Sequence, residues 1–496
     1  MIRFPALVLF LTLPLVAAVP AIAADDEPFE ILSIPGDGRT VAAELADLNG
    51  DGRTDLLQIA IIGIPPAERR LIRVRYQTAE GTLPELPDLE VEVPANSAVY
   101  DMADLRDTPG DEIVFLRPDR LTIVSLASPP GQRWDLPVPG ANTVGAAQDE
   151  RGLDPFRLVW NDFGPEPWLL VPQLGRMTAL SPRGEVLATF AVGARANYFV
   201  PSKPSLYFME SDIQLFLDFP AISVADADGD GRADVMASTR HDLRVYRQRD
   251  DGSFPVEPDQ LYELGLVTES DHIRGSGGVA TQARDFDGDG RADLLITHVS
   301  GSFADARTQT MAYLNRGDHW DLAHPDQTYT SESTLGSATL IDLDGDGVLE
   351  LVRAGIPFSV LEFIEVIVTR AIDVRVAIYK IDGEGGFAKK PWRRMKLDLS
   401  LSFDTFRTSG FLPTMHGDLN ADGHRDLLLS GDGDQVEVFL GGPKQRFSEP
   451  DAIQKLDTQG VLHLGDWDGD GLTDLLIFNP HEPGSPTRIA RNRGRL

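Results

Sequence analysis

The sequence predicts an all-β fold, a β-propeller of eight four-stranded blades. Three observations support this class. A short acidic motif recurs at intervals of roughly 60 residues, the length of one blade with its loops. Each copy leads directly into a short apolar run that is typical of a buried strand. The chain also contains 46 glycines and 35 prolines, which supply the many turns that such a fold needs.

The recurring motif reads D-x-[DN]-x-D-G-x-x-[DE]. Its six copies start at Asp47, Asp226, Asp285, Asp342, Asp418 and Asp466. A degenerate copy starts at Asp104, and the interval from there to Asp226 leaves room for one more unit without the motif. Eight units therefore fit the chain. A ring of seven blades is the alternative, if the unit without a motif is an insertion.

The elements between the motifs can be placed in order. Residues 29–34 form a strand that we expect to pair with the last blade and close the ring. The unit without a motif contains four short runs, which we interpret as strands over 156–160, 168–172, 177–181 and 186–190. A capping box and helical spacing of apolar residues predict one inserted helix over 359–371, with a long buried strand as the alternative.

The N-terminus resembles a targeting segment. Residues 1–23 contain one arginine, an apolar run and a small-x-small cleavage site, which together indicate a secretory signal peptide. The run is too short for the ~20 apolar residues of a spanning helix. We therefore expect residues 24–496 to form a single propeller domain that is exported to the periplasm or the extracellular space, without membrane insertion.

Composition excludes several functions. The chain has no cysteine, so disulfides, thiolate metal sites and cysteine nucleophiles are impossible. It has 77 acidic and 45 basic residues and a formal net charge of −32, which disfavours nucleic-acid binding. Much of this charge lies in the six motifs, so it indicates metal sites more than a uniformly anionic surface.

The motif predicts a cation site in each loop. Side chains at positions 1, 3 and 5 converge, glycine at position 6 permits a turn with positive φ, position 7 offers its backbone carbonyl, and position 9 closes the site. An all-oxygen set of this size suits Ca²⁺ better than Mg²⁺, zinc or copper. No copy has the glutamate at position 12 that an EF-hand requires. The predicted ligands are Asp47, Asn49, Asp51, Arg53, Asp55; Asp226, Asp228, Asp230, Arg232, Asp234; Asp285, Asp287, Asp289, Arg291, Asp293; Asp342, Asp344, Asp346, Val348, Glu350; Asp418, Asn420, Asp422, His424, Asp426; and Asp466, Asp468, Asp470, Leu472, Asp474.

Loops of this kind between propeller strands resemble the FG-GAP/VCBS repeat family, the fold of the integrin α-subunit head and of many secreted bacterial proteins. The resemblance implies up to six structural Ca²⁺ ions as the cofactors. In the degenerate copy, Arg106 stands at position 3 and Pro109 at position 6, and we expect the Arg106 guanidinium to replace the ion. Asn49, Asn420 and Ala421 should weaken the first and fifth loops.

These features favour a non-enzymatic binding or interaction scaffold, with a protein or carbohydrate as the partner. No catalytic residue is assigned. Two alternatives use the same propeller: an extracellular carbohydrate-active enzyme of the polysaccharide lyase type, and a lectin with exposed aromatic residues between its blades.

Overall fold

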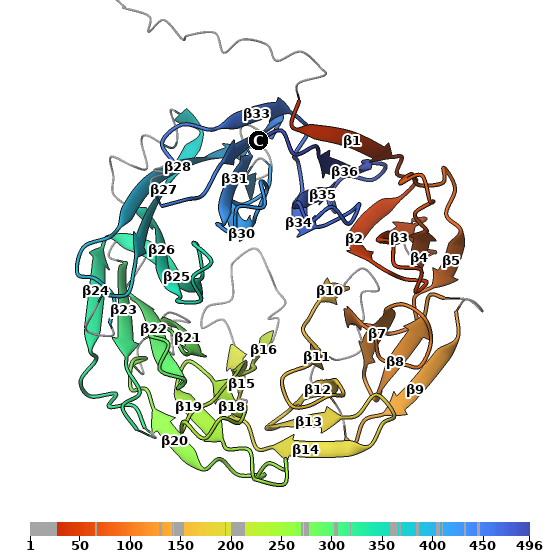
Figure 1. Ribbon diagram of the computed structural model, residues 1–496. Coiled ribbons are helices and arrows are strands. Elements are labelled where there is room, and N and C mark those ends of the chain that lie inside the picture. Colours follow the sequence, from red (N-terminus) through yellow and green to blue (C-terminus); the bar gives the residue numbers. More distant parts are fainter. Residues whose placement is uncertain are drawn as a thin grey trace, which may run out of the picture.

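The computed structural model describes residues 27–496 except 65–66, 128–130, 141, 143–152, 194, 200–213, 269–270, 272–276, 302–305, 318, 358–365, 367–368, 383–385, 403–406, 409, 431–432 and 444–446. These residues form a ring of eight antiparallel four-stranded blades (Figure 1). The predicted signal peptide, residues 1–23, lies outside the described residues.

The first four blades follow one another along the chain. Their strands are β2 (Arg39–Ala46), β3 (Asp55–Ile62), β4 (Arg69–Arg75) and β5 (Leu89–Glu92); β6 (Val99–Ala103), β7 (Glu112–Arg117), β8 (Arg120–Ser125) and β9 (Arg133–Pro137), with β10 (Asp154–Pro155) added beside β6; β11 (Val159–Trp160), β12 (Trp168–Gln173), β13 (Arg176–Leu180) and β14 (Val186–Phe190); and β17 (Ala221–Ala225), β18 (Asp234–Ser238), β19 (Asp242–Tyr246) and β20 (Gln260–Glu263).

The remaining blades complete the ring. Their strands are β21 (Gly278–Arg284), β22 (Asp293–Ser300), β23 (Arg307–Tyr313) and β24 (Gln327–Glu332); β25 (Thr334–Ile341), β26 (Glu350–Pro357), β27 (Ala371–Tyr379) and β28 (Arg393–Ser402), with β29 (Arg407–Thr408) added; β30 (Thr414–Gly417), β31 (Asp426–Ser430), β32 (Gln435–Phe439) and β33 (Ala452–Lys455); and β34 (Val461–Gly465), β35 (Asp474–Phe478), β36 (Thr487–Asn492) and β1 (Phe29–Ile34).

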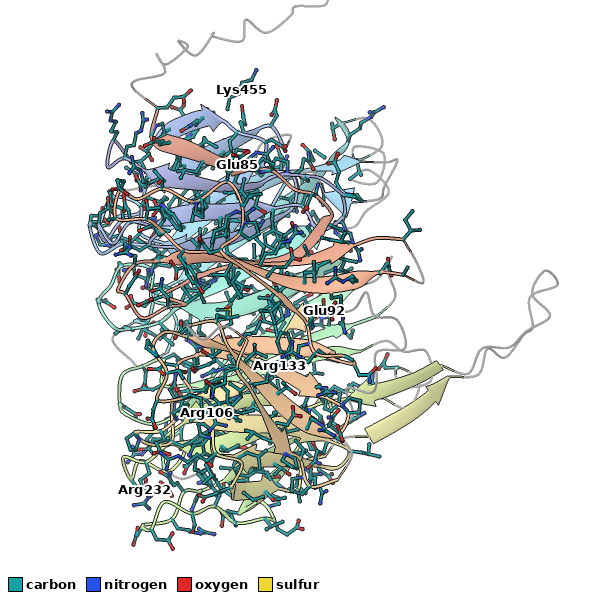
Figure 2. The ribbon with its side chains drawn as sticks, turned by 90° about the vertical axis from the view of Figure 1, so that its right-hand side faces the viewer. Glu85, Glu92, Arg106, Arg133, Arg232 and Lys455 are labelled. Atoms are coloured by element: carbon teal, nitrogen blue, oxygen red, sulfur yellow. The ribbon has the colours of Figure 1, made fainter. Side chains whose placement is uncertain are left out.

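The unit without a motif is blade 3, made of β11 to β14. This confirms eight blades and excludes the seven-blade alternative. The hairpin of β15 (Arg195–Phe199) and β16 (Gln214–Asp218), which the sequence analysis did not predict, follows this blade. Figure 2 shows its two yellow strands extending beyond the blades on the side opposite the labelled Arg232.

The predicted closing strand is confirmed. β1 pairs antiparallel with β36, from Phe29 opposite Asn492 to Ile34 opposite Thr487. Gln454 of blade 7 also exchanges hydrogen bonds with the backbone of Phe29, at 2.8 and 2.9 Å. The last blade therefore contains strands from both ends of the described chain, and β1 covers the edge of β36.

The hydrophobic core is a ring of clusters between blades. The second strand of a blade is buried on both faces, as in Asp55–Ile62 (DLLQIAII). Its side chains alternate between the two neighbouring blades. Eight clusters result, one at each junction, including the closing junction between blades 8 and 1. This explains why continuous apolar runs follow each motif.

The predicted helix over 359–371 lies mostly outside the described residues. The amide of Arg370 donates a helix-type bond of 2.9 Å to the carbonyl of Val366, and Ala371 already begins β27. The helix itself stays a prediction.

A polar cluster crosses the closing junction. The Glu44 carboxylate of β2 accepts a bond of 2.8 Å from the Tyr100 hydroxyl of β6 and lies 3.1 Å from His463 Nδ1 of β34. The hydrogen bond to Glu44 raises the pKa of His463 and outweighs the opposing effect of burial. Three neighbouring blades therefore meet at one carboxylate.

This cluster predicts a pH-dependent contribution to stability. A raised folded-state pKa means that the His463 contribution is complete below the unfolded histidine pKa of about 6.5 and is lost as pH rises through the folded-state pKa. We expect the unfolding midpoint of the wild type to exceed that of Glu44→Gln by most at low pH, with a pH-dependent part of about 1 kcal/mol or less. In a His463→Gln background that pH dependence should vanish. A midpoint difference that stays constant from acidic to alkaline pH would contradict the prediction.

Candidate metal centre

Each predicted cation loop connects the first and second strands of a blade. Because the strand order is the same in every blade, these loops lie on one face of the ring. Arg232, labelled in Figure 2, marks this face. The fold therefore gathers motifs that are far apart in the sequence onto a single surface.

The aspartate at position 1 shapes the loop. Asp226 accepts hydrogen bonds of 2.6 Å from the amides of Gly229 and Gly231. The two glycines have φ of 80° and 85°, a region that side chains disfavour. The predicted turn at position 6 is therefore present. In blade 7, Ala421 takes the place of the first glycine at φ 55°, so this loop carries backbone strain that the others avoid.

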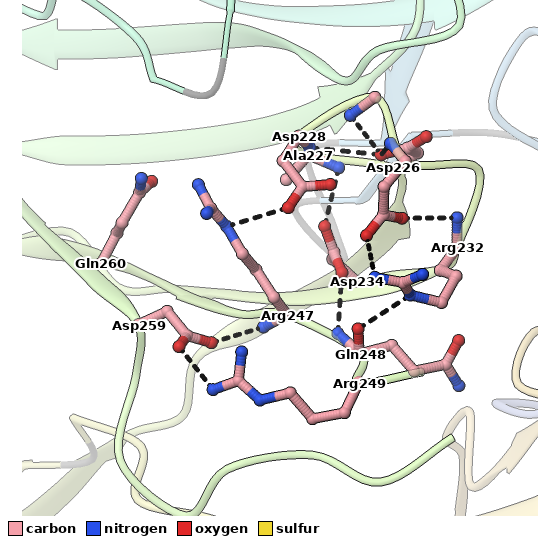
Figure 3. Close-up of polar contacts among 12 residues, drawn as sticks. Asp226, Ala227, Asp228, Arg232, Asp234, Arg247, Gln248, Arg249, Asp259 and Gln260 are labelled. Atoms are coloured by element: carbon pink, nitrogen blue, oxygen red, sulfur yellow. Dashed lines mark hydrogen bonds and ion pairs between the residues drawn. The ribbon is translucent and has the colours of Figure 1, made fainter. Parts of the chain in front are cut away.

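The residue at position 9 joins the loop to the body of the blade. Asp234 is fully buried. Its two oxygens accept bonds of 2.9 Å from the amides of Ala227 in the loop and Gln248 after β19 (Figure 3). Burial raises the pKa of Asp234 to about 6 and that of Asp293 to about 7. A neighbouring cation would offset this cost because it favours the ionised carboxylate.

In four blades the acidic side chains converge. In each group, one oxygen per residue lies within 4.8 Å of the others. The groups are Asp226, Asp228 and Asp230; Asp285, Asp287 and Asp289; Asp342, Asp344 and Glu350; and Asp466, Asp468 and Asp474. Among the described residues, Oδ1 of Asp228 and Oδ1 of Asp344 are buried and have no hydrogen-bond partner. A buried carboxylate oxygen without a donor, within an all-oxygen set, fits a hard divalent cation.

In blades 1 and 7 an asparagine stands at position 3. The side-chain oxygens of Asn49 and Asn420 accept bonds of 2.9 and 3.2 Å from the amides of Asp51 and Asp422. The amide group is neutral, so each of these loops has one carboxylate fewer than the others. The predicted ligands at positions 1, 5 and 9 keep the same backbone bonds as elsewhere, for example Asp47 with Gly52 at 2.9 Å.

Residues at position 7 have a further role that the sequence analysis missed. The backbone amides of Val348, His424 and Leu472 donate to the position 5 aspartate at 2.8 to 2.9 Å. Where position 7 is arginine, its guanidinium also pairs with that aspartate, as in Arg53 with Asp51 and Arg232 with Asp230. The arginines therefore stabilise the loop by side-chain contacts as well.

Basic side chains in the third strand of a blade, or directly after it, also reach the loops. The Lys380 ammonium contacts the Asp344 carboxylate and lies 3.6 Å from Glu350. Arg247 lies 3.4 Å from Asp228, with its guanidinium directed at that carboxylate (Figure 3). Arg491 lies 3.7 Å from Asp468. No sequence signal marks these residues, because they lie far from the motifs along the chain.

The loops are linked to one another around the ring. In five blades the residue at position 8 donates to a carbonyl at the start of the preceding blade's motif. The pairs are Asp111 with Asp47 at 2.8 Å, Ala292 with Asp226 at 2.6 Å, Arg425 with Leu343 at 2.8 Å, Thr473 with Asp418 at 3.2 Å and, through its hydroxyl, Thr54 with Asp466 at 3.0 Å. A cation that holds one loop therefore also supports the contact with the next blade.

The degenerate loop of blade 2 has Asp104 at position 1 and Glu112 at position 9. The Glu112 carboxylate accepts bonds from the Thr108 hydroxyl and from the amides of Leu105 and Arg106, the latter two at 2.8 and 3.1 Å. The Arg106 guanidinium lies over the Trp134 ring, 5.0 Å from its centroid; burial lowers the pKa of Arg106, and the nearby Glu112 carboxylate opposes that shift. That this guanidinium replaces the ion stays a prediction.

Part of the chain matches a known repeat. Three stretches, residues 226–296, 285–352 and 418–477, match the FG-GAP-like repeat. Each begins at one acidic loop and extends past the next, so together they include the five loops of blades 4 to 8. A comparison with curated proteins finds no significant match.

Solved structures of other proteins align with most of the chain at low identity. A lectin of Agrocybe aegerita, whose structure concerns recognition of non-reducing terminal N-acetylglucosamine, is 14% identical over 94% of this chain and 95% of its own, with a TM-score of 0.39. The V. cholerae biofilm matrix protein Bap1 is 11% identical over 92% and 88%, with a TM-score of 0.37. Sqt1 from Chaetomium thermophilum is 10% identical over 92% and 97%, with a TM-score of 0.42.

Proposed function

Because the chain carries FG-GAP-like repeats on an eight-blade β-propeller, we propose that it is an exported, calcium-stabilised binding scaffold without catalytic activity of its own. One observation carries the proposal: acidic side chains converge in four loops, two of them with a buried carboxylate oxygen that has no donor among the described residues. The loops of blades 1 and 7 would complete a set of up to six Ca²⁺ sites.

The position of the loops supports a structural role for the ions. Each loop lies at the junction of two blades and is hydrogen-bonded to its neighbour, so an ion there would stabilise the ring. The predicted ligands at positions 1, 3, 5 and 9 would supply carboxylate or amide oxygens, and position 7 its backbone carbonyl. Ions placed in this way act on the frame and leave other surfaces available for a protein or carbohydrate partner.

Export rests on the signal-peptide features of residues 1–23. Within the part of the chain that the structure describes, no helix combines the length and the apolar character that a membrane span requires. Millimolar calcium outside the cytoplasm matches the affinity range of about 10⁻⁴–10⁻³ M that is typical of extracellular calcium modules.

Calorimetric titration of the metal-depleted protein with Ca²⁺ tests the proposal. We expect four to six bound ions, with weaker binding of Mg²⁺ because it prefers fewer protein ligands and strict octahedral geometry. Asp287→Asn should remove or weaken one ion, whereas Asp398→Asn, an exposed aspartate on β28 outside the loops, should leave the stoichiometry unchanged. The absence of Ca²⁺ binding at millimolar concentration would overturn the proposal.

A further inference from the structure

A cavity of about 670 Å³ lies between blades 5 and 6, on the left of the ring in Figure 1. Strands β23 and β24 form one wall and β25 to β28 form the other. Four basic residues line it: Arg353, Arg375, Arg394 and Lys396. This concentration of cations is unexpected in a chain with a net charge of −32. We refer to this cavity as the basic groove.

Strand register explains why the basic groove is hollow. Ala377 of β27 is paired with Arg353 on β26 and with Arg394 on β28, so the two arginines flank a small residue on the same face. In the next row, Gly355 is paired with Arg375, which is itself paired with Lys396. Small residues thus form the floor and long cationic side chains form the rim.

A second glycine deepens the floor. Gly336 is paired with Gly355. A Cβ atom at position 336 would lie 3.2 Å from Thr308 Cγ2 of blade 5 and 2.9 Å from the carbonyl oxygen of Ala354. A larger residue there would therefore crowd the wall of the basic groove.

Two of the guanidinium groups are available for an anion. Arg353 donates to Thr310 Oγ1 at 3.2 Å and to Ser331 Oγ at 3.1 Å, and it lies 5.3 Å from the centroid of the Tyr329 ring. These contacts hold its position without neutralising its charge. Among the ion pairs of the described residues, none involves Arg353 or Arg394. In the basic groove, Arg353 therefore provides a positive charge that is held in place, and Arg394 provides an exposed one.

The other charges near the basic groove are mostly compensated. Lys396 is 2.9 Å from Asp373 and 3.6 Å from Asp398. The one acidic residue of the lining, Glu332, is 3.0 Å from Arg307. The net positive charge is thus concentrated at the row of Arg353 and Arg394.

The basic groove is separated from the acidic loops. Arg353 is three residues along β26 from Glu350, or about 10 Å at the rise of an extended strand. This slightly exceeds the Debye length of about 8 Å at physiological ionic strength. The negative charge of the predicted calcium loop is therefore partly screened at the arginines of the basic groove.

From this geometry we infer that the basic groove binds a short stretch of an acidic carbohydrate that bears carboxylate or sulfate groups. Guanidinium groups bind such anions through paired hydrogen bonds, and the hydroxyls of the lining, those of Thr308, Thr330, Ser331, Thr334 and Ser337, can bond sugar hydroxyls. An acidic glycan carries its charges singly along the chain, so it brings few of them near the acidic loops. The volume is that of a site for a small ligand. The inference rests on the proposed binding function and names its ligand class.

Binding assays with defined probes test the inference. We expect saturable binding of oligogalacturonate or of sulfated dextran oligomers in millimolar calcium, and none of neutral dextran. The two acidic probes distinguish carboxylate from sulfate recognition. The double variant Arg353→Gln/Arg394→Gln should weaken binding roughly tenfold or more, because each substitution removes a charge-assisted hydrogen bond. Raising salt from about 50 mM to about 200 mM should weaken wild-type binding as well.

Matched variants distinguish the effect of charge at the basic groove on glycan binding from the effect of charge elsewhere on the surface. Arg69→Gln/Arg120→Gln removes two exposed arginines from blades 1 and 2 and should bind as the wild type does. Ala377→Glu places a carboxylate between Arg353 and Arg394 and should abolish binding without removing either arginine. If Arg353→Gln/Arg394→Gln fails to fold, Ala377→Glu still decides whether the basic groove binds the glycan.

Three outcomes would overturn the inference. Neither acidic probe binds; the groove variants bind the acidic probes as tightly as the wild type does; or the protein binds polyglutamate or single-stranded DNA more tightly than the acidic glycans. The calcium-dependent shift in unfolding midpoint is measured on the same samples. If that shift persists while no glycan binds, the inference fails and the calcium scaffold stands. If the shift is absent, the calcium part of the proposed function fails, while the glycan assay still decides the inference.

Discussion

Removal of calcium is expected to lower the midpoint of thermal unfolding by about 5 °C. At millimolar Ca²⁺, a site with a dissociation constant of 10⁻⁴–10⁻³ M contributes roughly 1 kcal/mol. Six such sites contribute roughly 5–6 kcal/mol. The unfolding entropy of about 2 cal/mol/K per residue corresponds to about 1 kcal/mol/K for a chain of this size. The expected loss is therefore several degrees, spread over the blades that hold the loops.

The measurement compares scanning calorimetry in millimolar Ca²⁺ and in excess chelator at equal ionic strength. Magnesium in place of calcium should restore only part of the midpoint, because the loops offer more protein oxygens than Mg²⁺ usually takes. An unchanged midpoint in chelator would contradict a stabilising role for the ions. If sodium chloride restores the midpoint that is lost in chelator, the loss reflects repulsion among the acidic residues and not the removal of a specific ion.

Asp474→Ala is expected to destabilise the protein by about 3 kcal/mol even without calcium. The Asp474 carboxylate is fully buried and accepts bonds of 2.6 Å from the amides of Trp467 and Asn492. Its removal leaves two buried amides unpaired, each costing about 1–3 kcal/mol. Asn492 also donates through its side chain to the Leu419 carbonyl of blade 7, at 2.6 Å, so the damage extends to the neighbouring blade.

The matched control is Asp470→Ala in the same loop. Asp470 is exposed, and its carboxylate accepts a bond of 2.8 Å from the amide of Leu472. This variant should lose about 1 kcal/mol in calcium and little in chelator, because its main role would be at the ion. Unfolding of both variants in the two buffers checks the distinction. Equal losses for Asp470→Ala and Asp474→Ala in chelator would show that the buried carboxylate has no separate structural role.

Much of the fold could be predicted because its information is local. The motif is complete within nine residues, and the apolar pair after position 9 marks the second strand, as in Leu475-Leu476. A regular interval then predicts a blade even where the motif is lost, as in blade 3. The hairpin of β15 and β16 was missed because it belongs to no repeat, so no interval pointed to it.

The contents of the candidate sites were only partly predictable. The loop ligands are neighbours in sequence, so the convergence of three acidic side chains in each of blades 4, 5, 6 and 8 follows from the motif. The contact of Arg106 with the Trp134 ring was not predictable, because a position in a motif does not show whether an aromatic ring lies close enough to attract the side chain.

The sequence by itself determined the class of the fold, the closing strand and the identity of the oxygen-rich loops, whereas the choice of eight blades over seven needed the structure. Only the tertiary structure decided which distant residues meet: Glu44 with His463, which are 419 residues apart, Lys380 with Asp344, and the row of Arg353 and Arg394 across Ala377. The reason is physical. A loop motif is set by backbone turns within one segment, whereas contacts across and between blades depend on strand register, and a shift of one residue would turn each side chain to the opposite face.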